Sequence, residues 1–284
     1  MNKVKIITDS TCDMGADLAK KYDVEVLPLY VNFTDESFKD GVNISTEELY
    51  KLVEKKNELP KTAAIDIVTL EETFKKWLDQ GYDIIFTGIS KSMSRTYENA
   101  VMAKDELEAN NIYIVDSKNL STGIALTVLK ACKYRDEGLS AKEIVDKMLE
   151  ITDKVKAQFG IETMDYLHKG GRCSSVAKLF GTILKIKPII FVRDGKMSVG
   201  MKPIGKMKVA LDKMIDMFLT DYRNGNVDRD KVFITHSIAI ESEKYIRERL
   251  EAEVKDMEII STVAGCVISS HCGKGTIGIL YITK

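Results

Sequence analysis

The 284-residue sequence has no long hydrophobic run and no excess of either charge. Its apolar stretches fall short of the roughly 18 to 20 residues that a membrane helix needs, so stable membrane insertion is not expected. The first residues, from Met1 to Ile6, lead directly into a strand-like pattern without a signal region, which predicts a cytoplasmic location. The 42 Lys and Arg residues nearly balance the 43 Asp and Glu residues, so nucleic acid is not an expected partner.

Paired cysteines and metal-ligand spacings are also missing. The cysteines are five in number, scattered, and never spaced Cys-x-x-Cys, which favours reduced structural thiols over a disulfide framework or a zinc knuckle. The three histidines, His168, His236 and His271, are not spaced as metal ligands relative to one another or to cysteine. We therefore expect no metal site.

Nucleotide and hydrolase motifs are absent as well. The run Gly273-Lys274-Gly275-Thr276 resembles a phosphate loop, but the Walker pattern requires Ser or Thr directly after Gly-Lys and a glycine further upstream. No Gly-x-Gly-x-x-Gly follows a strand, and no Gly-x-Ser-x-Gly is present. The sequence predicts no resident cofactor.

The first half of the chain alternates strand and helix signals. Short runs rich in β-branched residues, at 4–8, 24–31, 84–87 and 112–115, are typical of strands. Ser45, Thr69 and Ser140 are each followed three residues later by a glutamate, which is the pattern of a capping box at a helix start. Repeated strand, helix, strand predicts a parallel sheet covered by helices on both faces.

The second half changes character near residue 156. Six strand candidates lie at 157–163, 188–193, 196–199, 231–236, 258–263 and 277–282, with about three helices left to cover them. Asp194-Gly195 is a strong signal for a tight hairpin turn between two of these strands. We predict an α/β protein of two domains: an α/β/α parallel-sheet domain at 1–156, and a two-layer α/β domain with a six-stranded mixed or antiparallel sheet at 157–284. The ligand is expected between or beside them.

The segment from Gly265 to Gly278 is the most informative part of the chain. An apolar run there gives way to small residues, and His271 is followed by Gly273, Gly275 and Gly278. Glycine tolerates close approaches and backbone angles that other residues avoid. The pattern predicts a tight, exposed loop that holds an imidazole.

Three other polar clusters are candidate sites, each with a structural alternative. Asp9 and Ser10 follow the first strand, where ligands bind in open parallel sheets, but they also fit a turn that caps the next helix. The hydroxyl-rich segment 89–97 precedes a predicted helix, whose free N–H groups would stabilise an anion or need only an ordinary cap. Lys169-Gly170-Gly171-Arg172 suits a turn that grips anionic oxygens, or a solvated basic turn.

Taken together, five segments resemble the DegV proteins, a bacterial fatty-acid-binding family. The segments, in order, are Ile6–Met14, Val26–Val31 with Asp40–Ser45, Val115–Ser117, Leu167–Arg172 and the glycine-rich segment around His271. The resemblance extends over essentially the whole chain. It implies an α/β/α domain paired with a smaller α/β domain.

The resemblance also implies roles for individual residues. Thr62 and Ser94 match the two family loops whose hydroxyls bind the fatty-acid carboxylate. Arg172 and His271 match residues near the buried headgroup that serve transfer of the acid to a kinase. Asp9, Ser10, Arg95 and Gly273 are further candidates for contact with the headgroup.

The chain departs from the family pattern in both headgroup loops. After Thr62, the family's Ser-Gln-Pro-Ser is replaced by Ala63, Ala64, Ile65 and Asp66. Arg95 stands where the family has a glycine. These changes are expected to alter headgroup contacts or the preference for chain length, and Arg95 either tightens anion binding or blocks the usual backbone geometry.

The leading functional hypothesis, implied by the resemblance, is a non-catalytic binding subunit of bacterial fatty acid kinase. It would enclose a palmitate, stearate or oleate type of ligand in a buried tunnel and present the carboxylate to a separate ATP-dependent kinase. The acyl phosphate would enter phospholipid metabolism. The alternative is a small-molecule hydrolase or transferase that uses Ser94, Asp9 or His271. A regulatory module for a retinoid or sterol is a third reading.

Overall fold

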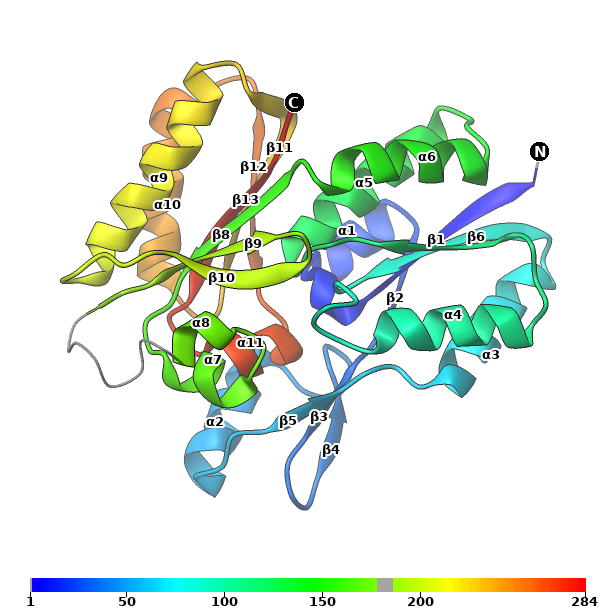
Figure 1. Cartoon of the computed structure of the whole chain (residues 1–284), viewed down its shortest axis with the longest axis horizontal. Coiled ribbons are helices and arrows are strands. Elements are labelled where there is room, and N and C mark those ends of the chain that lie inside the picture. Colours follow the sequence, from blue (N-terminus) through cyan, green and yellow to red (C-terminus); the bar gives the residue numbers. More distant parts are fainter. Residues whose placement is uncertain (1, 178–185) are drawn as a thin grey trace.

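The computed structural model describes residues 2–177 and 186–284. Its strands form a four-stranded sheet of order β2-β1-β6-β7, a six-stranded sheet of order β10-β9-β8-β13-β11-β12 and a small sheet of order β4-β3-β5. The two large sheets lie side by side, with the small sheet below the junction in the view of Figure 1. The predicted α/β class with two unlike sheets is confirmed.

The four-stranded sheet is parallel throughout. It consists of β1 (Lys3–Asp9), β2 (Val24–Leu27), β6 (Tyr82–Gly88) and β7 (Ile112–Asp116). Successive residues of a strand face opposite sides, so Ile6 packs in the core that includes α5 and α6, and Ile7 packs in the core with α3 and α4. The predicted cover of helices on both faces is confirmed. The helices are α1 (Gly15–Lys21), α3 (Ile67–Leu78), α4 (Thr96–Glu106), α5 (Thr122–Asp136) and α6 (Ala141–Thr152).

The prediction of one strand over 24–31 is wrong, because the chain changes sheets at Pro28. Proline has no N–H to continue a ladder, and the strand β2 ends at Leu27. β3 (Tyr30–Asn32) instead pairs antiparallel with β4 (Ser37–Lys39) and β5 (Lys61–Ala63). This small sheet, with α2 (Thr46–Lys56) beside it, brings β5 under the junction of the two large sheets.

Two of the three predicted capping boxes are present. Ser45 and Ser140 cap α2 and α6, and each receives the reciprocal bond from its glutamate. Thr69 does not cap a helix, because α3 begins at Ile67 and the Asp66 carboxylate accepts the N–H of Thr69 at 2.8 Å. A better acceptor lies three residues earlier than the predicted start.

The six-stranded sheet contains all six predicted strands. They are β8 (Val155–Gly160), β9 (Ile189–Arg193), β10 (Lys196–Met201), β11 (Val227–His236), β12 (Glu258–Val263) and β13 (Ile277–Thr283). Only β11 and β12 pair parallel, so the sheet is mixed. Asp194 (φ 49°) and Gly195 (φ 74°) form the predicted turn between β9 and β10, since both residues adopt the positive φ of a tight hairpin.

The estimate of about three helices in this half is too low. Two long helices, α9 (Met207–Arg223) and α10 (Ile240–Glu253), pack on the sheet. The described residues add three short ones, α7 (Asp165–Gly170), α8 (Ser174–Ala177) and α11 (Cys266–Cys272). Helices of four to seven residues carry too little periodicity to be recognised from the sequence.

Helix α5 lies in a hydrophobic cluster that extends across both large sheets. Every residue from Thr122 to Cys132 is buried, and one cluster runs from Val4 and Ile6 through this helix to Phe159 and Leu280. A division at residues 156 and 157 stays a prediction, although β8, the first strand of the six-stranded sheet, begins at Val155.

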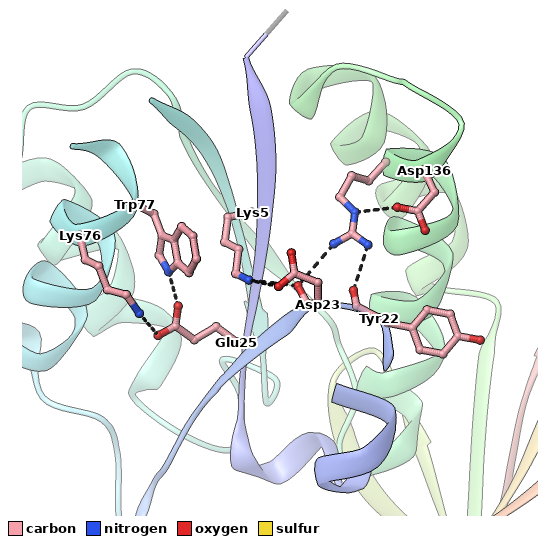
Figure 2. A network of polar contacts seen from close by, with 8 residues as sticks. Lys5, Tyr22, Asp23, Glu25, Lys76, Trp77 and Asp136 are labelled. Atoms are coloured by element: carbon pink, nitrogen blue, oxygen red, sulfur yellow. Dashed lines mark hydrogen bonds and ion pairs between the residues drawn. The ribbon is translucent and has the colours of Figure 1, made fainter. Parts of the chain in front are cut away.

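A polar network ties the edge strand β2 to the helices on either side of its sheet (Figure 2). The nearly buried Lys5 ammonium lies 2.6 Å from Asp23 and 4.3 Å from the centre of the Trp77 ring. Glu25 accepts hydrogen bonds from Trp77 and Lys76 of α3, and Arg135 of α5 donates to the Tyr22 carbonyl at 2.9 Å. The network fastens β2 without contributing to the cavities described below.

Candidate functional site

A cavity of about 220 Å³ brings together five of the residues singled out in the sequence. Thr62, Ser94, Arg95, Arg172 and His271 all line it, although they come from four separate segments of the chain. The remaining lining residues are apolar: Leu29, Ala63, Ala64, Ile89, Met93, Val267 and Ile268. We call this space the polar cavity.

The small sheet positions Thr62. β5 pairs with β3 so that Thr62 stands opposite Val31, and its hydroxyl lies 2.8 Å from His271 Nε2. This contact connects residues 209 positions apart in the sequence. The side chains of Thr62 and His271 therefore form one wall of the polar cavity.

Asp9 holds the segment that supplies Ser94 and Arg95. Its buried carboxylate accepts the N–H of Ile89 at 2.8 Å and the N–H of Thr11 at 3.0 Å, together with the Thr11 hydroxyl. Burial raises the pKa of Asp9 to about 6, and these hydrogen bonds oppose the rise. Of the two readings of Asp9, the turn cap describes its contacts.

Ser94 and Arg95 lie directly before α4. The Ser94 hydroxyl accepts the N–H of Thr96 at 3.2 Å and lies 3.0 Å from the Thr96 hydroxyl. Arg95 occupies the position before the first residue of α4, makes no cap with its side chain, and is exposed. The helix start predicted within 89–97 is therefore present, and anion binding there stays a prediction.

The predicted exposed loop around His271 is wrong, because the residues from Cys266 to Cys272 form the helix α11. Most of its side chains are buried, and His271 lies in the last turn with only partial exposure. The glycines act at the ends: Gly265 precedes the helix, and Gly273 leaves it with φ 80°. The imidazole is thus presented by a short buried helix.

Two buried carboxylates from the first half of the chain cap this helix. Asp13 accepts the N–H of Gly265 at 2.8 Å, and Asp40 accepts those of Cys266 at 2.6 Å and Val267 at 3.3 Å. Gly265 has no side chain with which to cap the helix itself. Burial raises the pKa of both carboxyls, and the hydrogen bonds to the helix N–H groups oppose that rise. Sequence reasoning missed both roles, since no local pattern links residues 226 to 252 positions apart.

The Lys169–Arg172 turn brings a guanidinium to the mouth of the polar cavity. Arg172 is exposed, and its Nη1 donates to the Gly170 carbonyl at 2.7 Å. A Cβ on Gly170 would collide with His271 Nδ1, so glycine is what allows the turn to approach the imidazole. The glycine pair therefore places Arg172 beside His271.

His271 is uncharged at neutral pH. Burial, and to a lesser extent the positive charge of Arg172, lower the pKa of the imidazole to about 4. Within the described residues Nδ1 has no hydrogen-bond partner. The side chain therefore offers a neutral hydrogen-bonding group to the polar cavity.

A second cavity, of about 50 Å³, shares Ile268 and His271 with the polar cavity. Leu120, Phe159 and Leu280 contribute apolar walls from both halves of the chain. We call this space the apolar cavity.

The hydroxyl groups around the apolar cavity are already engaged with the protein. Ser237 lies 2.5 Å from the Tyr50 hydroxyl, Thr235 lies 2.6 Å from that of Thr122, and Thr276 donates to the Cys272 carbonyl at 2.7 Å. Ser121 donates to Asp13. A molecule inside this space would therefore meet mainly hydrocarbon surface.

Three of the candidate headgroup residues do not line the polar cavity. Asp9 holds the segment that follows β6, Gly273 ends α11, and Ser10 donates to Asp40 at 2.9 Å while accepting the N–H of Leu29 at 3.1 Å. These residues position the segments that line the cavity and do not line it themselves.

Two further features are absent from the part of the chain that the structure describes. No three His, Cys, Asp or Glu side chains there are arranged to hold a metal ion. No helix in residues 2–177 and 186–284 has the length and apolar character needed to cross a membrane.

Comparisons with known proteins agree on one family. A sequence model described as "Uncharacterised protein, DegV family" matches residues 3–284. A DegV domain-containing protein of Clostridium acetobutylicum is 36% identical over 290 residues, covering 100% of both chains. The crystal structure of DegV of Bacillus subtilis, described as a fatty acid binding protein, has a TM-score of 0.89 with 26% identity and covers 100% of each chain.

A further similar structure is that of a stearic acid-binding protein from Eubacterium ventriosum. Its TM-score is 0.85 at 25% identity, and the match covers 100% of this chain and 99% of that one. The similarity therefore includes both large sheets and the segments between them.

Replacing Asp40 by alanine is expected to destabilise the protein, because two buried N–H groups of α11 lose their acceptor. We expect the free energy of unfolding in urea at pH 7 to fall by about 1 to 3 kcal/mol. Asp153→Ala is the control: its carboxylate lies 2.7 Å from Lys118 but is largely exposed, so the loss should stay below about 1 kcal/mol. Equal losses in the two variants would contradict the role of Asp40.

The pKa of His271 is expected to depend on Arg172. The NMR resonance of the His271 imidazole is identified by its absence from the spectrum of His271→Gln. In the wild type this resonance should titrate near pH 4, since burial and the guanidinium both disfavour the imidazolium. Arg172→Gln removes the positive charge, so the pKa should move up toward the ordinary value of 6.5. A pKa that does not change in Arg172→Gln would show that the guanidinium does not act on His271.

Proposed function

The chain belongs to the DegV family, and from this premise we propose that it is a carrier of one long-chain fatty acid. The carboxylate lies in the polar cavity, at Thr62 and Ser94, and the acyl chain extends past Ile268 into the apolar cavity. The ligand is of the palmitate, stearate or oleate type. Solved relatives described as binding fatty acid, including stearic acid, support this class of ligand.

The observation that carries the proposal is the shared wall between the two cavities. On one side of this wall lie hydroxyl and guanidinium groups, and on the other lie apolar side chains and hydroxyl groups that are already bonded within the protein. A fatty acid has this same division between a polar end and a hydrocarbon chain. Burial of hydrocarbon gains about 0.8 kcal/mol per methylene, so about 15 methylenes supply roughly 12 kcal/mol before the cost of immobilisation.

The apolar cavity must enlarge to hold such a chain. At about 50 Å³ it is far below the roughly 300 to 1,000 Å³ of ordinary ligand sites. Ile268 lies on the shared wall and is only half-buried, so its side chain can turn without disturbing the capped start of α11. We propose that Ile268 repacks around the entering acyl chain.

The carboxylate is then presented to a separate ATP-dependent fatty acid kinase, and the carrier takes up the acyl phosphate for phospholipid metabolism. Arg172 is exposed at the cavity mouth, where a partner can reach it. His271 lines the same cavity and is less exposed. The sequence has no recognised nucleotide motif, which is consistent with catalysis in the partner. The proposal places the protein in the cytoplasm, with the ATP that the kinase uses.

The geometry gives less support to the hydrolase or transferase reading. Ser94 hydrogen-bonds to Thr96, and His271 to Thr62, so the described residues do not pair this serine with this base. Asp9 is engaged with Ile89 and Thr11 and does not orient the imidazole.

The first test is the mass of the purified protein. Native mass spectrometry should show an excess equal to one fatty acid of about 14 to 20 carbons, which denaturing extraction then releases. Ile268→Trp should lose most of this excess, because an indole at the shared wall fills the path of the acyl chain.

The control for that variant is Ile240→Trp, which places the same side chain at a position that is 59% exposed and lines neither cavity. It should retain the ligand. A wild-type protein that is free of ligand and takes up neither palmitate nor oleate would contradict the carrier function. An extracted retinoid or sterol would assign a different ligand.

We expect one pair of residues to serve binding of the fatty acid and another pair to serve its transfer to the kinase. Ser94→Ala and Thr62→Ala each delete a protein hydroxyl that would hydrogen-bond to the carboxylate. Each loss should cost about 1 to 3 kcal/mol of binding free energy, so fatty-acid affinity should fall roughly 5- to 150-fold. Arg172→Ala and His271→Ala should still copurify with lipid but fail in an assay coupled to the cognate kinase. Unchanged affinity in the first pair, or full phosphorylation in the second, would refute the assigned roles.

A further inference from the structure

The polar cavity carries two positive charges and no negative one. Its charged lining residues are Arg95 and Arg172, and no Asp or Glu lines it. His271 adds no charge at neutral pH, because its pKa is lowered to about 4. Arginine stays protonated, so the cavity presents a fixed charge of two guanidinium groups.

Neither arginine has a carboxylate partner among the described residues. Arg172 donates only to the Gly170 carbonyl, and the side chain of Arg95 makes no hydrogen bond or ion pair there. Lys91, on the same segment as Arg95, behaves differently: its ammonium lies 4.0 Å from Asp116 and 5.7 Å from the centre of the Tyr97 ring. The two arginines that line the cavity are therefore available to pair with an anionic ligand.

The single negative charge of a carboxylate can neutralise only one of the two guanidinium charges that line the cavity. A carboxylate carries one negative charge, whereas a phosphate group bound through oxygen carries about 1.5 to 2 at neutral pH and offers three strong acceptor oxygens. The planar guanidinium forms paired hydrogen bonds with such oxygens. Two guanidiniums on one small cavity thus fit a phosphoryl group better than a carboxylate.

We infer that the polar cavity is selective for a doubly charged headgroup, and that Arg95 together with Arg172 holds the phosphoryl group of a long-chain acyl phosphate. Arg95 is the specificity-determining residue, because it supplies the second charge. The inference rests on the proposed function. A carrier with this preference retains the phosphorylated product more tightly than the acid from which the product is made.

The test compares three ligands with the same saturated C16 hydrocarbon tail, at a pH where the phosphonate is fully ionised. Hexadecylphosphonate carries two negative charges, its monomethyl ester carries one on the same phosphorus geometry, and palmitate reports the proposed function itself. The wild type should bind the phosphonate at least about 10-fold more tightly than the ester, equivalent to about 1.4 kcal/mol.

The variants assign that preference to Arg95. Arg95→Gln should reduce the ratio of the two affinities to about threefold or less, and Arg95→Lys should restore part of it, because a lysine keeps the charge without the planar fork. Lys91→Gln removes a cation from the same segment outside the cavity and should leave the ratio unchanged. Arg95 is exposed, so its substitution should leave the thermal unfolding temperature near that of the wild type.

The outcomes separate this inference from the carrier proposal. If the wild type binds palmitate but does not distinguish phosphonate from ester, the charge selectivity is wrong and the carrier function stands. A preference that survives unchanged in Arg95→Gln, or that falls equally in Lys91→Gln, overturns the role of Arg95. Failure to bind palmitate at all overturns the proposed function.

Discussion

The arrangement of both cavities depends on the capping of α11 by Asp13 and Asp40. Three N–H groups at the start of this helix are accepted by carboxylates from the first half of the chain. Burying two carboxylates is costly, and the hydrogen bonds from the helix, whose N-terminus carries partial positive charge, offset that cost. Because α11 carries both Ile268 and His271, these bonds fix the wall that the polar and apolar cavities share.

The short segment from Asp9, the last residue of β1, to Asp13 positions the rest of the site in the same way. Asp9 holds the strand-to-helix segment that ends in Ser94 and Arg95, Ser10 bonds to Asp40 and to the backbone of Leu29, and Asp13 holds α11. Polar residues at the carboxyl end of a parallel strand are expected to contact ligand. Here these polar residues hydrogen-bond to three other segments of the chain and hold them in place. The groups that face the cavity come from those segments.

Burial and charge divide the site into three zones. The apolar cavity has its hydroxyl groups bonded within the protein, the shared wall has a neutral imidazole, and the mouth has two exposed guanidiniums. The guanidinium of Arg172 is part of the reason that His271 is neutral. The order of these zones matches the polarity of a ligand with a hydrocarbon tail and an anionic end, although the apolar cavity must enlarge to hold the tail.

The sequence alone determined the elements with strong local signals. Both large sheets, the Asp194-Gly195 hairpin and the caps at Ser45 and Ser140 follow from periodicity and turn chemistry, and Thr62 was found only through resemblance to a family. The tertiary structure decided the rest. It shows α11 as a helix although glycines surround it, ends β2 at Leu27, just before Pro28, and brings Asp13 and Asp40 to a helix more than 220 residues away. Short helices and long-range hydrogen bonds leave no periodic trace in a sequence, because packing between distant segments stabilises them.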